Sequence, residues 1–474
     1  MGHVVSPPVM GRIRHMHFVG IGGAGMGGIA ELVHNLGYQV TGSDVSVNSM
    51  VQRLSGLGIQ IQQGHDTSYA KGCDVLVVST AVDANNPELI YAHEQHIPVV
   101  PRAEMLAELM RFRYGIAIAG THGKTSTTSL VVSVLAKAGL DPTFVIGGKL
   151  NSVGANAQLG GGRYLVAEAD ESDASFLHLQ PMMAVLTNID HDHMSTYGND
   201  FSRLRDTFLE FLHHLPFYGL AVVCIDDPEI KALLDDIQRP VLSYGFDEAA
   251  QVRASDLRQE GNTTYFKVAL PSQATSLEVQ LNMAGKHNAL NALGAIAVAY
   301  ELGVSLDVMQ DALATFQGVG RRLQQYGLME VGSRSVLMMD DYAHHPTELR
   351  ASIDAVQKGW PGKRLVLVFQ PHRYSRTHDL FDDFVRTLAD VDVLVLLEVY
   401  PAGEIPINGA DSIDLCRSIR ARGGVDPILV KNMDELVVTL KNILANDDLV
   451  LTVGAGDIGR MASELPARLK ECVG

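Results

Sequence analysis

The stretch Tyr114–Leu130 holds the residue types and the spacing best suited to bind a phosphate. An apolar run, Ile116–Ala119, is typical of a buried strand, and it breaks at a turn that contains Gly120 and Gly123. A Ser/Thr-rich segment with helix-forming residues follows this turn. A strand, a glycine turn and a helix start favour an anion, because closely approaching backbone N–H groups and the positive end of the helix dipole attract negative charge.

Lys124 and Thr125 stand at the start of that predicted helix. Lys124 would reach the outer phosphates of a nucleoside triphosphate, and the Thr125 hydroxyl would bind Mg²⁺. Ile118 occupies the place of the first glycine in the usual G-x-x-x-x-G-K-S/T pattern, so a chance Gly-Lys-Thr is the alternative. The other residues predicted to bind the nucleotide in this loop are Gly120, Thr121, His122, Gly123 and Ser126.

A cluster of carboxylates follows the next predicted strand, Tyr164–Ala167. Four acidic residues lie within the six positions from Glu168 to Asp173, and carboxylate oxygens are the ligands that a hard cation such as Mg²⁺ requires. We expect Glu168, the closest to the strand, to be the metal ligand. The other carboxylates are then solvated or cap the next helix.

Two histidines flank an aspartate after a further predicted strand, Ala184–Leu186. The segment His191–His193 suggests a zinc site, but no third nitrogen or sulfur ligand stands at a suitable spacing. We therefore assign His193 to the magnesium and phosphate region.

A second glycine-rich turn stands near the N-terminus. The predicted strand His17–Val19 runs into Gly20, Gly22 and Gly25, which form G-x-G-x-x-G at the start of a helix, and the next strand ends at Asp44. This layout favours a diphosphate at the helix N-terminus, in NAD or in a UDP-sugar alike, with Asp44 on a ribose hydroxyl. A purely structural glycine turn is the alternative. The residues expected at this site are Gly22, Gly23, Ala24, Gly25 and Asp44. His65 and Ser79 lie just after predicted strands, on the ligand side of such a sheet, and an ordinary loop residue is the alternative for each.

His287 and Asn291 stand four residues apart at the start of a predicted helix, so they share one face. Their polar groups could read a purine edge, and a helix-start cluster of caps and solvated side chains is the alternative. A domain boundary is expected after this helical region. Arg321 and Arg322 follow it and could touch a phosphate once the domains close.

From Ser335 onward, predicted strands and helices alternate again, as in a doubly wound sheet. In such sheets the carboxyl ends of the strands face the ligand. Three residues that follow strands, His344, Arg373 and Arg376, would gather into a pocket suited to a carboxylate. A solvated basic loop is the alternative for the two arginines.

The composition argues against several classes of function. The chain has 474 residues, and 37 Lys and Arg against 54 Asp and Glu give a net charge of −17, which disfavours nucleic acid as a partner. The four cysteines have no metal-site spacing and fit a reducing cytoplasm. We expect no membrane insertion, because no apolar run is long enough to span a bilayer. We also expect a disordered leader before His15, where Met1, Gly2 and Ser6 match a myristoylation pattern only loosely.

Seven segments together resemble the Mur ligase family, in their residues and in their order. They are G-I-G-G-A-G-M at 20–26, G-T-H-G-K-T at 120–125, A-E-A-D-E-S-D at 167–173, G-K-H-N-A-L-N-A at 285–292, G-R-R at 320–322, D-D-Y-A-H-H-P at 340–346 and F-Q-P-H-R-Y-S-R at 369–376. The resemblance implies three α/β domains. These are a Rossmann-like UDP-sugar-binding domain at 1–113, a P-loop-type ATP-binding catalytic domain at 114–319 and a Rossmann-like amino-acid-binding domain at 320–474.

The resemblance also implies a reaction and residue roles. Within the family, the chain is most similar to members that use ATP and Mg²⁺ in the cytoplasm to join L-alanine to the lactyl carboxylate of UDP-N-acetylmuramate, through an acyl phosphate. Lys124, Glu168 and His193 match catalytic positions, and Thr125, Glu168 and His193 match the magnesium region. Further positions matched to ATP are His287, Asn291, Arg322 and Asp341. Those matched to a substrate carboxylate are His344, Arg373 and Arg376.

Two other classes of function stay open at this level. An NAD-dependent oxidoreductase would use the turn at Gly20–Gly25 but would leave the Lys124 loop and the carboxylates without a role. A nucleotide-gated binding protein would hydrolyse ATP without any amino acid. The residues do not distinguish L-alanine from glycine or L-serine. Nor do they predict the general base, the ligands of a second Mg²⁺ or the oligomeric state.

Overall fold

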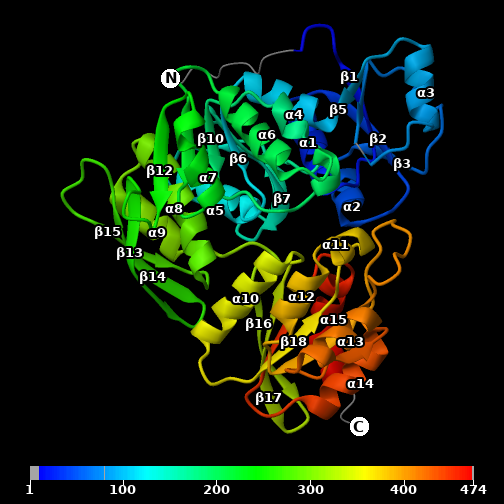
Figure 1. Ribbon diagram of the computed structural model, residues 1–474. Coiled ribbons are helices and arrows are strands. Elements are labelled where there is room, and N and C mark those ends of the chain that lie inside the picture. Colours follow the sequence, from blue (N-terminus) through cyan, green and yellow to red (C-terminus); the bar gives the residue numbers. More distant parts are fainter. Residues whose placement is uncertain (1–9, 80, 472–474) are drawn as a thin grey trace. The chain divides into compact units, whose positions relative to one another are not determined.

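The computed structural model describes residues 10–79 and 81–471 of the chain. They form three β-sheets with helices between the strands (Figure 1). The chain divides into two compact units. The first contains the chain up to Ser255 with Lys267–Val279 and Leu290–Gln317, and the second contains Asp256–Phe266, Gln280–Ala289 and the chain from Gly318 onward.

The first sheet has five parallel strands in the order β3-β2-β1-β4-β5. β1 lies between β2 and β4, so the strand order reverses beside β1, where open α/β sheets form a crevice for ligands. The strands are β1 (His15–Val19), β2 (Gln39–Asp44), β3 (Gln60–Gln63), β4 (Val75–Val78) and β5 (Val99–Pro101). The helices are α1 (Ala24–Asn35), α2 (Ser49–Gly56), α3 (Pro87–Glu94) and α4 (Arg102–Arg111).

Local sequence signals explain the helix boundaries in this region. The segment after the first glycine turn predicts a helix to Leu36 with Gly37 as its C-terminal cap. The α1 helix ends at Asn35, and Gly37 has a φ of 91° that suits glycine. Asn48 caps α2 with its side-chain oxygen, and Asn86 caps α3 in the same way. Pro87 occupies the first turn of α3, where its missing N–H costs nothing.

The apolar residues at 97–100 predict a strand, but the observed strand β5 starts only at Val99. The backbone N–H of Ile97 still donates to the carbonyl of Ala92, 2.8 Å away, so the chain is closing the end of α3 at that point. His96 has a φ of 54° in the same turn. Ile97 and Pro98 therefore precede the strand, although the apolar pattern at 97–100 predicts that they belong to it.

The second sheet has ten strands in the order β15-β14-β13-β12-β11-β10-β6-β9-β7-β8. β10, β6 and β9 are adjacent and parallel, so the segments that follow them meet at one edge. The strands are β6 (Tyr114–Ala119), β7 (Thr143–Leu150), β8 (Ala155–Gln158), β9 (Tyr164–Glu168), β10 (Met183–Leu186), β11 (Leu220–Cys224), β12 (Val241–Gly245), β13 (Val252–Glu260), β14 (Thr263–Ala269) and β15 (Leu277–Leu281). The helices are α5 (Lys124–Lys137), α6 (Phe201–His213), α7 (Pro228–Leu233), α8 (Lys286–Glu301) and α9 (Leu306–Ala314), with short 3₁₀ turns η1 (Ser175–His178), η2 (Met194–Tyr197) and η3 (Leu234–Asp236).

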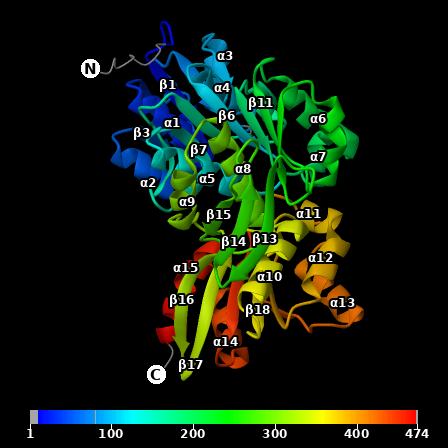
Figure 2. The same cartoon turned by 90° about the vertical axis from the view of Figure 1, so that its left-hand side faces the viewer.

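Strands β13, β14 and β15 extend this sheet beyond the strands predicted from the sequence (Figure 2). Residues of β15 alternate between buried and exposed, as expected for a strand with one solvated face. The distal ends of β13 and β15, the start of β14 and the start of α8 belong to the second compact unit.

The third sheet has six strands in the order β16-β17-β21-β18-β19-β20, with β16 antiparallel and the others parallel. The strands are β16 (Gln324–Val331), β17 (Arg334–Asp341), β18 (Leu365–Phe369), β19 (Val393–Leu397), β20 (Ile428–Val430) and β21 (Leu449–Val453). The helices are α10 (Pro346–Gly359), α11 (Tyr374–Asp379), α12 (Phe381–Leu388), α13 (Ser412–Arg422), α14 (Met433–Ile443) and α15 (Ile458–Glu471).

Helices cover both faces of this third sheet, so its central strands are apolar throughout. On β18, Leu365, Leu367 and Phe369 pack into one core, and the alternating Val366 and Val368 pack into another. Continuous apolar runs are typical of parallel strands buried on two sides. Such runs predict four strands of this sheet, at 336–339, 365–369, 393–397 and 449–453, whereas β16 and β20 were not predicted.

Three cysteines within the described residues, Cys73, Cys224 and Cys416, are buried thiols. Cys472 and the leader residues 1–9, including the loose myristoylation match, lie outside the described residues. Among the helices of the described ranges, none combines the length and apolar character needed to cross a membrane.

Two glycines of the first sheet region provide a test of the packing. A Cβ on Gly42 of β2 would lie 2.6 Å from Ile21 Cδ1 and 2.9 Å from the Phe18 carbonyl, whereas a Cβ on Gly56 of α2 would meet no atom within 4 Å. We expect G42A to lower the free energy of unfolding by about 1–3 kcal/mol through overpacking. The control G56A is expected to raise it by about 0.4–1 kcal/mol or leave it unchanged. Urea unfolding measures both, and equal stability of G42A and wild type would contradict the packing at β2.

Candidate functional site

The glycine loop after β6 can adopt its path only with glycine at two positions. Gly120 and Gly123 have φ values of 126° and 81°, in the region that glycine favours. A Cβ on Gly123 would overlap the Asn291 side chain, and a Cβ on Gly120 would overlap Thr187. The loop therefore packs closely against α8 and the end of β10, and Lys124 begins α5 directly after it.

Residues after β10 hold this loop by hydrogen bonds. The His122 backbone N–H donates to Asn188 Oδ1 at 2.7 Å, and Asn188 Nδ2 donates to the His122 carbonyl at 3.0 Å. Thr187 Oγ1 donates to the same carbonyl at 2.7 Å. His122 Nε2 lies 3.0 Å from Asp190 Oδ2. Asn188 was not predicted as a site residue, although its place directly after a buried strand is a signal that could have indicated it.

The Lys124 ammonium is surrounded by acceptors of its own loop and of the acidic cluster. Lys124 Nζ donates to the carbonyls of Gly120 at 2.7 Å and Thr121 at 3.0 Å. It also donates to both oxygens of Glu171, at 2.9 and 2.7 Å. Glu171, rather than Glu168, is therefore the carboxylate that pairs with Lys124. This pairing was not predicted from the sequence.

Burial and mutual attraction oppose each other in this pair. Burial would lower the pKa of Lys124, but attraction to Glu171 and Asp170 outweighs it and raises that pKa above its usual value. Burial raises the pKa of Glu171 to about 7, although Lys124 opposes the shift. Lys124 is therefore cationic at neutral pH, as phosphate binding requires.

Thr125 and Glu168 lie together, as predicted. Thr125 Oγ1 donates to Glu168 Oε2 at 3.2 Å, and the other carboxylate oxygen accepts from the Gly147 backbone N–H at 2.8 Å. A hydroxyl and a carboxylate at this distance fit a magnesium ion, which prefers hard oxygen ligands. His193 lies in the loop after β10, at the same edge of the sheet, with Nε2 3.5 Å from Asp192 Oδ2.

The two polar residues at the start of α8 take different positions. Asn291 Oδ1 accepts from Thr127 Oγ1 at 3.2 Å, so Asn291 lies against the phosphate loop and α5. His287 belongs to the second compact unit. Burial and the nearby Arg322 guanidinium lower the pKa of His287 to about 4, so the ring is neutral near pH 7.

Asp341 ends β17 and lies near Arg322. Its carboxylate accepts from the backbone N–H groups of Leu323 at 2.7 Å and Ala343 at 2.8 Å. Burial raises the pKa of Asp341 to about 6, although Arg322 opposes the shift. The carboxylate therefore joins the residue before β16 to the loop after β17, and Asp341 is only 5% exposed.

Two arginines flank one tyrosine at the start of this unit. The guanidinium carbons of Arg321 and Arg322 both lie 5.2 Å from the centroid of the Tyr342 ring. Arg321 also donates to Asp340 Oδ2 at 2.8 Å and to the Gly454 carbonyl at 2.6 Å. Arg321 thus has a structural role, and Tyr342 is a further residue that sequence analysis did not select.

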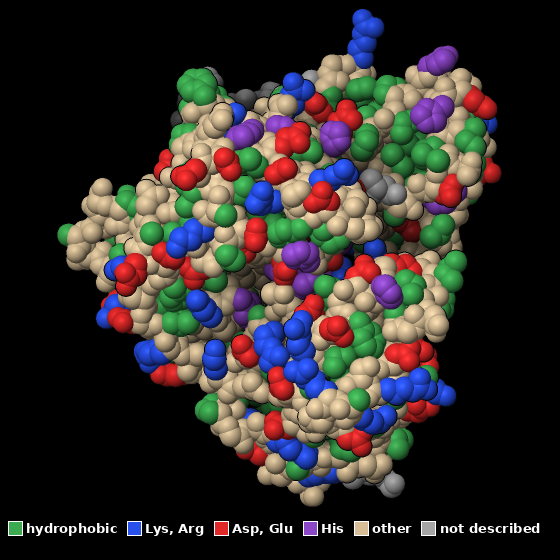
Figure 3. Space-filling model, viewed as in Figure 1, with side chains coloured by type: hydrophobic (Ala, Val, Ile, Leu, Met, Phe, Trp, Pro, Cys, Tyr) green, Lys and Arg blue, Asp and Glu red, His purple; other side chains and the backbone are tan. Residues whose placement is uncertain are grey.

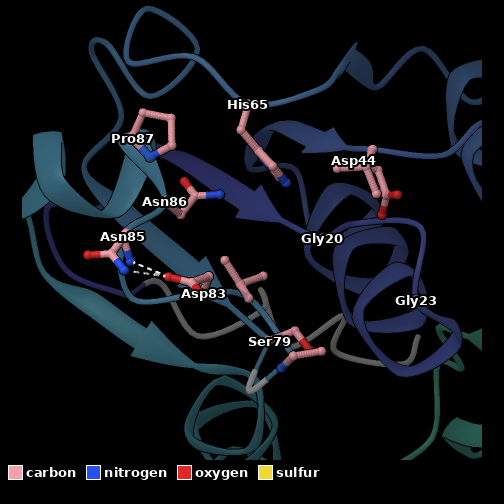
Figure 4. Close-up of a pocket in the computed structure, with 12 residues that line it drawn as sticks. Gly20, Gly23, Asp44, His65, Ser79, Asp83, Asn85, Asn86 and Pro87 are labelled. Carbon is pink, nitrogen blue, oxygen red and sulfur yellow. Dashed lines mark hydrogen bonds between the residues drawn. The ribbon is translucent and has the colours of Figure 1, made fainter. Parts of the chain in front are cut away.

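A pocket of about 680 Å³ opens in the N-terminal sheet, at the carboxyl ends of β1, β2 and β4 (Figure 4). It brings together four predicted residues, Gly23, Asp44, His65 and Ser79. The loop that leads into α3 supplies lining residues that were not predicted. They are Ala81, Val82, Asp83, Asn85, Asn86 and Pro87.

Asp44 lines this pocket and also holds its glycine turn by a hydrogen bond. Its Oδ2 accepts from the Gly22 backbone N–H at 2.8 Å, and its Oδ1 accepts from Ser46. Gly22 is buried, and Gly25 in the first turn of α1 faces the Arg102 side chain. Ala24 is the first residue of α1. Gly22 and Gly25 therefore shape the turn, while Gly20 and Gly23 line the pocket.

The three residues predicted to bind a carboxylate surround His372 in the second unit. The ring centroids of His344 and His372 lie 5.9 Å apart, and His372 stacks on Tyr400 with an interplanar angle of 10°. Arg373 is exposed and has a φ of 70°, and its backbone N–H donates to the Tyr400 carbonyl at 2.8 Å. Arg376 is only 8% exposed.

Positive charge gathers around His372. Burial lowers its pKa to about 4, and His344, Arg376 and Arg373 add to the shift. Figure 3 shows Lys and Arg side chains gathered on the surface over α10 and α12 of this unit. Such a concentration of cations suits an anionic ligand.

Comparison with known proteins agrees with this architecture. Three models of Mur ligase domains match the chain: a family catalytic domain at 15–114, a middle domain at 118–299 and a glutamate ligase domain at 321–456. A UDP-N-acetylmuramate–L-alanine ligase of Halorhodospira halophila is 58% identical over 455 residues, which cover 96% of this chain and 93% of that relative.

Solved structures show the same three-domain α/β fold, which confirms the predicted fold class. The UDP-N-acetylmuramate-alanine ligase of Thermotoga maritima superposes with a TM-score of 0.80 at 28% identity, over 97% of this chain and all of that one. A murein peptide ligase of Psychrobacter arcticus has a TM-score of 0.71 at 25% identity, over the same shares. The chain belongs to the Mur ligase family.

Proposed function

We propose that this chain is an ATP-dependent ligase that joins L-alanine to the lactyl carboxylate of UDP-N-acetylmuramate, a cytoplasmic step in the synthesis of peptidoglycan precursors. The observation that carries the proposal is the 58% identity to the Halorhodospira halophila ligase along almost its whole length. The geometry of the phosphate loop supports the use of ATP, because a cationic lysine, a hydroxyl and a carboxylate meet beside a helix start.

We assign the three substrates to three domains with the boundaries predicted above. Residues 1–113 hold the UDP-sugar, for which the pocket of about 680 Å³ with its glycine turn is suited. Residues 114–319 hold ATP, with Asn291 against the phosphate loop. We assign His287, and Arg322 and Asp341 from the range 320–474, as further nucleotide-binding residues. Residues 320–474 hold the amino acid, with His344, Arg373 and Arg376 around its carboxylate.

Mg²⁺ would be held by Thr125 and Glu168, with His193 close to a second ion. When bound there, the metal would screen the negative charge of the phosphates. Support for this assignment comes from the 3.2 Å contact between Thr125 Oγ1 and Glu168 Oε2.

The first chemical step activates the carboxylate. An oxygen of the lactyl carboxylate attacks the γ-phosphorus of ATP, the bond from that phosphorus to the β,γ-bridging oxygen breaks, and ADP leaves. The product is an acyl phosphate. Lys124 assists by neutralising charge on the transferred group, for which it must leave Glu171 or share its protons with the phosphate.

The second step forms the amide. The neutral amine of L-alanine attacks the acyl carbon, the tetrahedral oxyanion collapses and inorganic phosphate leaves. The attacking nitrogen loses one proton, and His193 or a bound water accepts it. Closure of the domains would keep water away from the acyl phosphate, which otherwise hydrolyses.

Phosphate release from ATP and Mg²⁺ tests the proposal, with UDP-N-acetylmuramate and L-alanine added singly and together. The proposal expects release only with both, and a product heavier by one alanine residue. Glycine and L-serine in place of L-alanine would then measure selectivity. Release without any amino acid would favour a nucleotide-gated binding protein, and a bound nicotinamide absorbance would favour an oxidoreductase.

Replacing Lys124 tests whether ATP and the sugar nucleotide bind at separate sites. K124A is expected to lower phosphate release at least about 100-fold, because a cation that stabilises the transferred group is lost. Binding of UDP-N-acetylmuramate by calorimetry should stay within about twofold, since the two pockets belong to different sheets. K137A is the matched control, because Lys137 ends the same helix and is 46% exposed. Loss of sugar binding in K124A would contradict the domain assignment.

The pH dependence of stability tests the environment of His372. Its pKa is lowered to about 4 from an ordinary value of 6.5, so the unfolded chain binds a proton that the folded chain does not. The resulting stability is fully present above about pH 6.5 and is lost as the pH falls toward 4. Between pH 7 and pH 5, the free energy of unfolding should therefore fall by about 1–2 kcal/mol less in H372Q than in wild type.

The control for this comparison is H378Q, because the His378 side chain is 58% exposed. Urea unfolding at each pH measures the free energies. The loss of the stacked ring will lower the stability of H372Q at every pH, so the difference in slope is the informative quantity. Equal slopes in H372Q and wild type would show that the ring is not held neutral.

A further inference from the structure

A carboxylate lies fully buried behind the N-terminal pocket. Glu88 stands in the first turn of α3 and is 0% exposed. Its Oε2 lies 2.6 Å from His17 Nε2, and its Oε1 lies 2.7 Å from His65 Nδ1. Ser43 Oγ donates to the two oxygens at 2.8 and 2.9 Å. Three segments of the first sheet region therefore converge on one carboxyl group.

The hydrogen bonds continue from Glu88 through β1 and β2 to the surface. His17 Nδ1 lies 2.8 Å from Thr41 Oγ1, and His15 Nε2 lies 2.8 Å from the same hydroxyl. His15 Nδ1 lies 3.1 Å from the Gly72 carbonyl oxygen, which can only accept, so that nitrogen donates.

Counting protons along this chain gives its net charge. The two contacts at Thr41 need two protons, and the Thr41 hydroxyl supplies only one. The contact of His15 Nδ1 with Gly72 and the contact between His17 and Glu88 each need one more proton. Two neutral histidines and the Thr41 hydroxyl, beside an ionised Glu88, supply one proton fewer than these contacts need in total. The chain from His15 to Glu88 is therefore neutral as a whole. A charge without such compensation would be costly at a fully buried site.

The same count fixes the orientation of His65. Because the internal proton of the network lies between His17 and Glu88, Glu88 Oε1 accepts from His65 Nδ1. His65 Nδ1 also lies 3.2 Å from Ser43 Oγ, and since the Ser43 hydroxyl donates to Glu88, this oxygen accepts from His65 as well. His65 then has its Nδ1–H directed to Glu88, and Nε2 is the ring nitrogen available to the pocket. His65 lines that pocket, and Figure 4 shows its side chain directed toward the space between Asn86 and Gly20.

We infer that Glu88 is a positioning residue for the sugar-nucleotide pocket, because it holds His65 in the Nδ1–H tautomer with Nε2 presented to the ligand. This inference rests on the proposed function for the identity of the ligand. Glu88 itself is buried and does not line the pocket, so its effect on binding passes through His65. The Asn86 cap of α3 fixes the backbone of Glu88, because Asn86 Oδ1 accepts from the Glu88 backbone N–H at 2.9 Å.

The substitution E88Q tests this role. It keeps the shape of the side chain but replaces the carboxylate by an amide with one acceptor oxygen and no negative charge. The hydrogen bond from His65 Nδ1 is then no longer charge-assisted, so KM for UDP-N-acetylmuramate should rise about tenfold. KM for ATP and kcat should change less than about twofold, because the phosphate loop belongs to another sheet. Thermal unfolding checks that the variant is folded.

E31Q is the matched control. Glu31 is a carboxylate in the same unit, only 6% exposed, and it pairs with Arg53 at 2.9 and 2.8 Å. It does not line the pocket. E31Q is therefore expected to leave KM for the sugar nucleotide within about twofold of wild type, even where it lowers stability to the same extent as E88Q.

A double-mutant cycle with H65N separates positioning from general structure. The asparagine amide nitrogen replaces Nδ1 and can still donate to Glu88, while the group at Nε2 is lost. In the H65N background, E88Q should change KM less than about twofold, because the group it positions is gone. An equal rise of KM in both backgrounds would overturn the inference.

Two measurements that do not need catalysis complete the test. Nitrogen-15 NMR of histidine-labelled wild type, assigned with H65N, should show His65 protonated on Nδ1 in mildly alkaline buffer, and an Nε2–H tautomer would overturn the inference. Calorimetry with UDP as the probe should show the same loss of affinity in E88Q as the kinetics. If UDP binds in this way but wild type forms no alanine adduct, the proposed function fails and the role of Glu88 stands.

Discussion

The functional side chains of this chain depend on one constraint, the shared direction of neighbouring parallel strands. β10, β6 and β9 run the same way, so the segments that follow them end at one edge of the sheet. Lys124 follows β6, Glu168 ends β9 and His193 follows β10. Because adjacent strands lie about 5 Å apart, side chains that are distant in the sequence come within bonding reach without any local signal for their pairing.

Two partly buried cations of this protein, Lys124 and Arg321, are matched by buried carboxylates. Lys124 is enclosed by Glu171 and two loop carbonyls, and Arg321 is fixed by Asp340 and the Gly454 carbonyl. Breaking such a pair by removing one member leaves a buried charge unmatched, which costs far more than the pair contributes. The protein therefore places its cations where packing and hydrogen bonds hold them in one position.

Much of the fold and part of the candidate site could be predicted from the sequence. Buried parallel strands such as β18 are continuous apolar runs, and the glycine turn before Lys124 has a pattern with a physical cause. The partners of the predicted residues could not be predicted in the same way. Glu88 meets His17 across 71 residues, and Glu171 meets Lys124 across 47, so neither pairing leaves a local periodicity or a spacing. Tertiary packing alone selects these carboxylates from their acidic neighbours.

The contacts of Lys124 bear on the energetics of any anion that uses it. Its ammonium already donates to Gly120, Thr121 and Glu171, so an incoming phosphate exchanges these acceptors for its own oxygens. Lys124 then contributes to the binding free energy only the difference between its hydrogen bonds to the anion and those that it gives up within the protein. Glu171 competes with the anion for Lys124, so the affinity of any anion there depends on how well its oxygens replace those of Glu171.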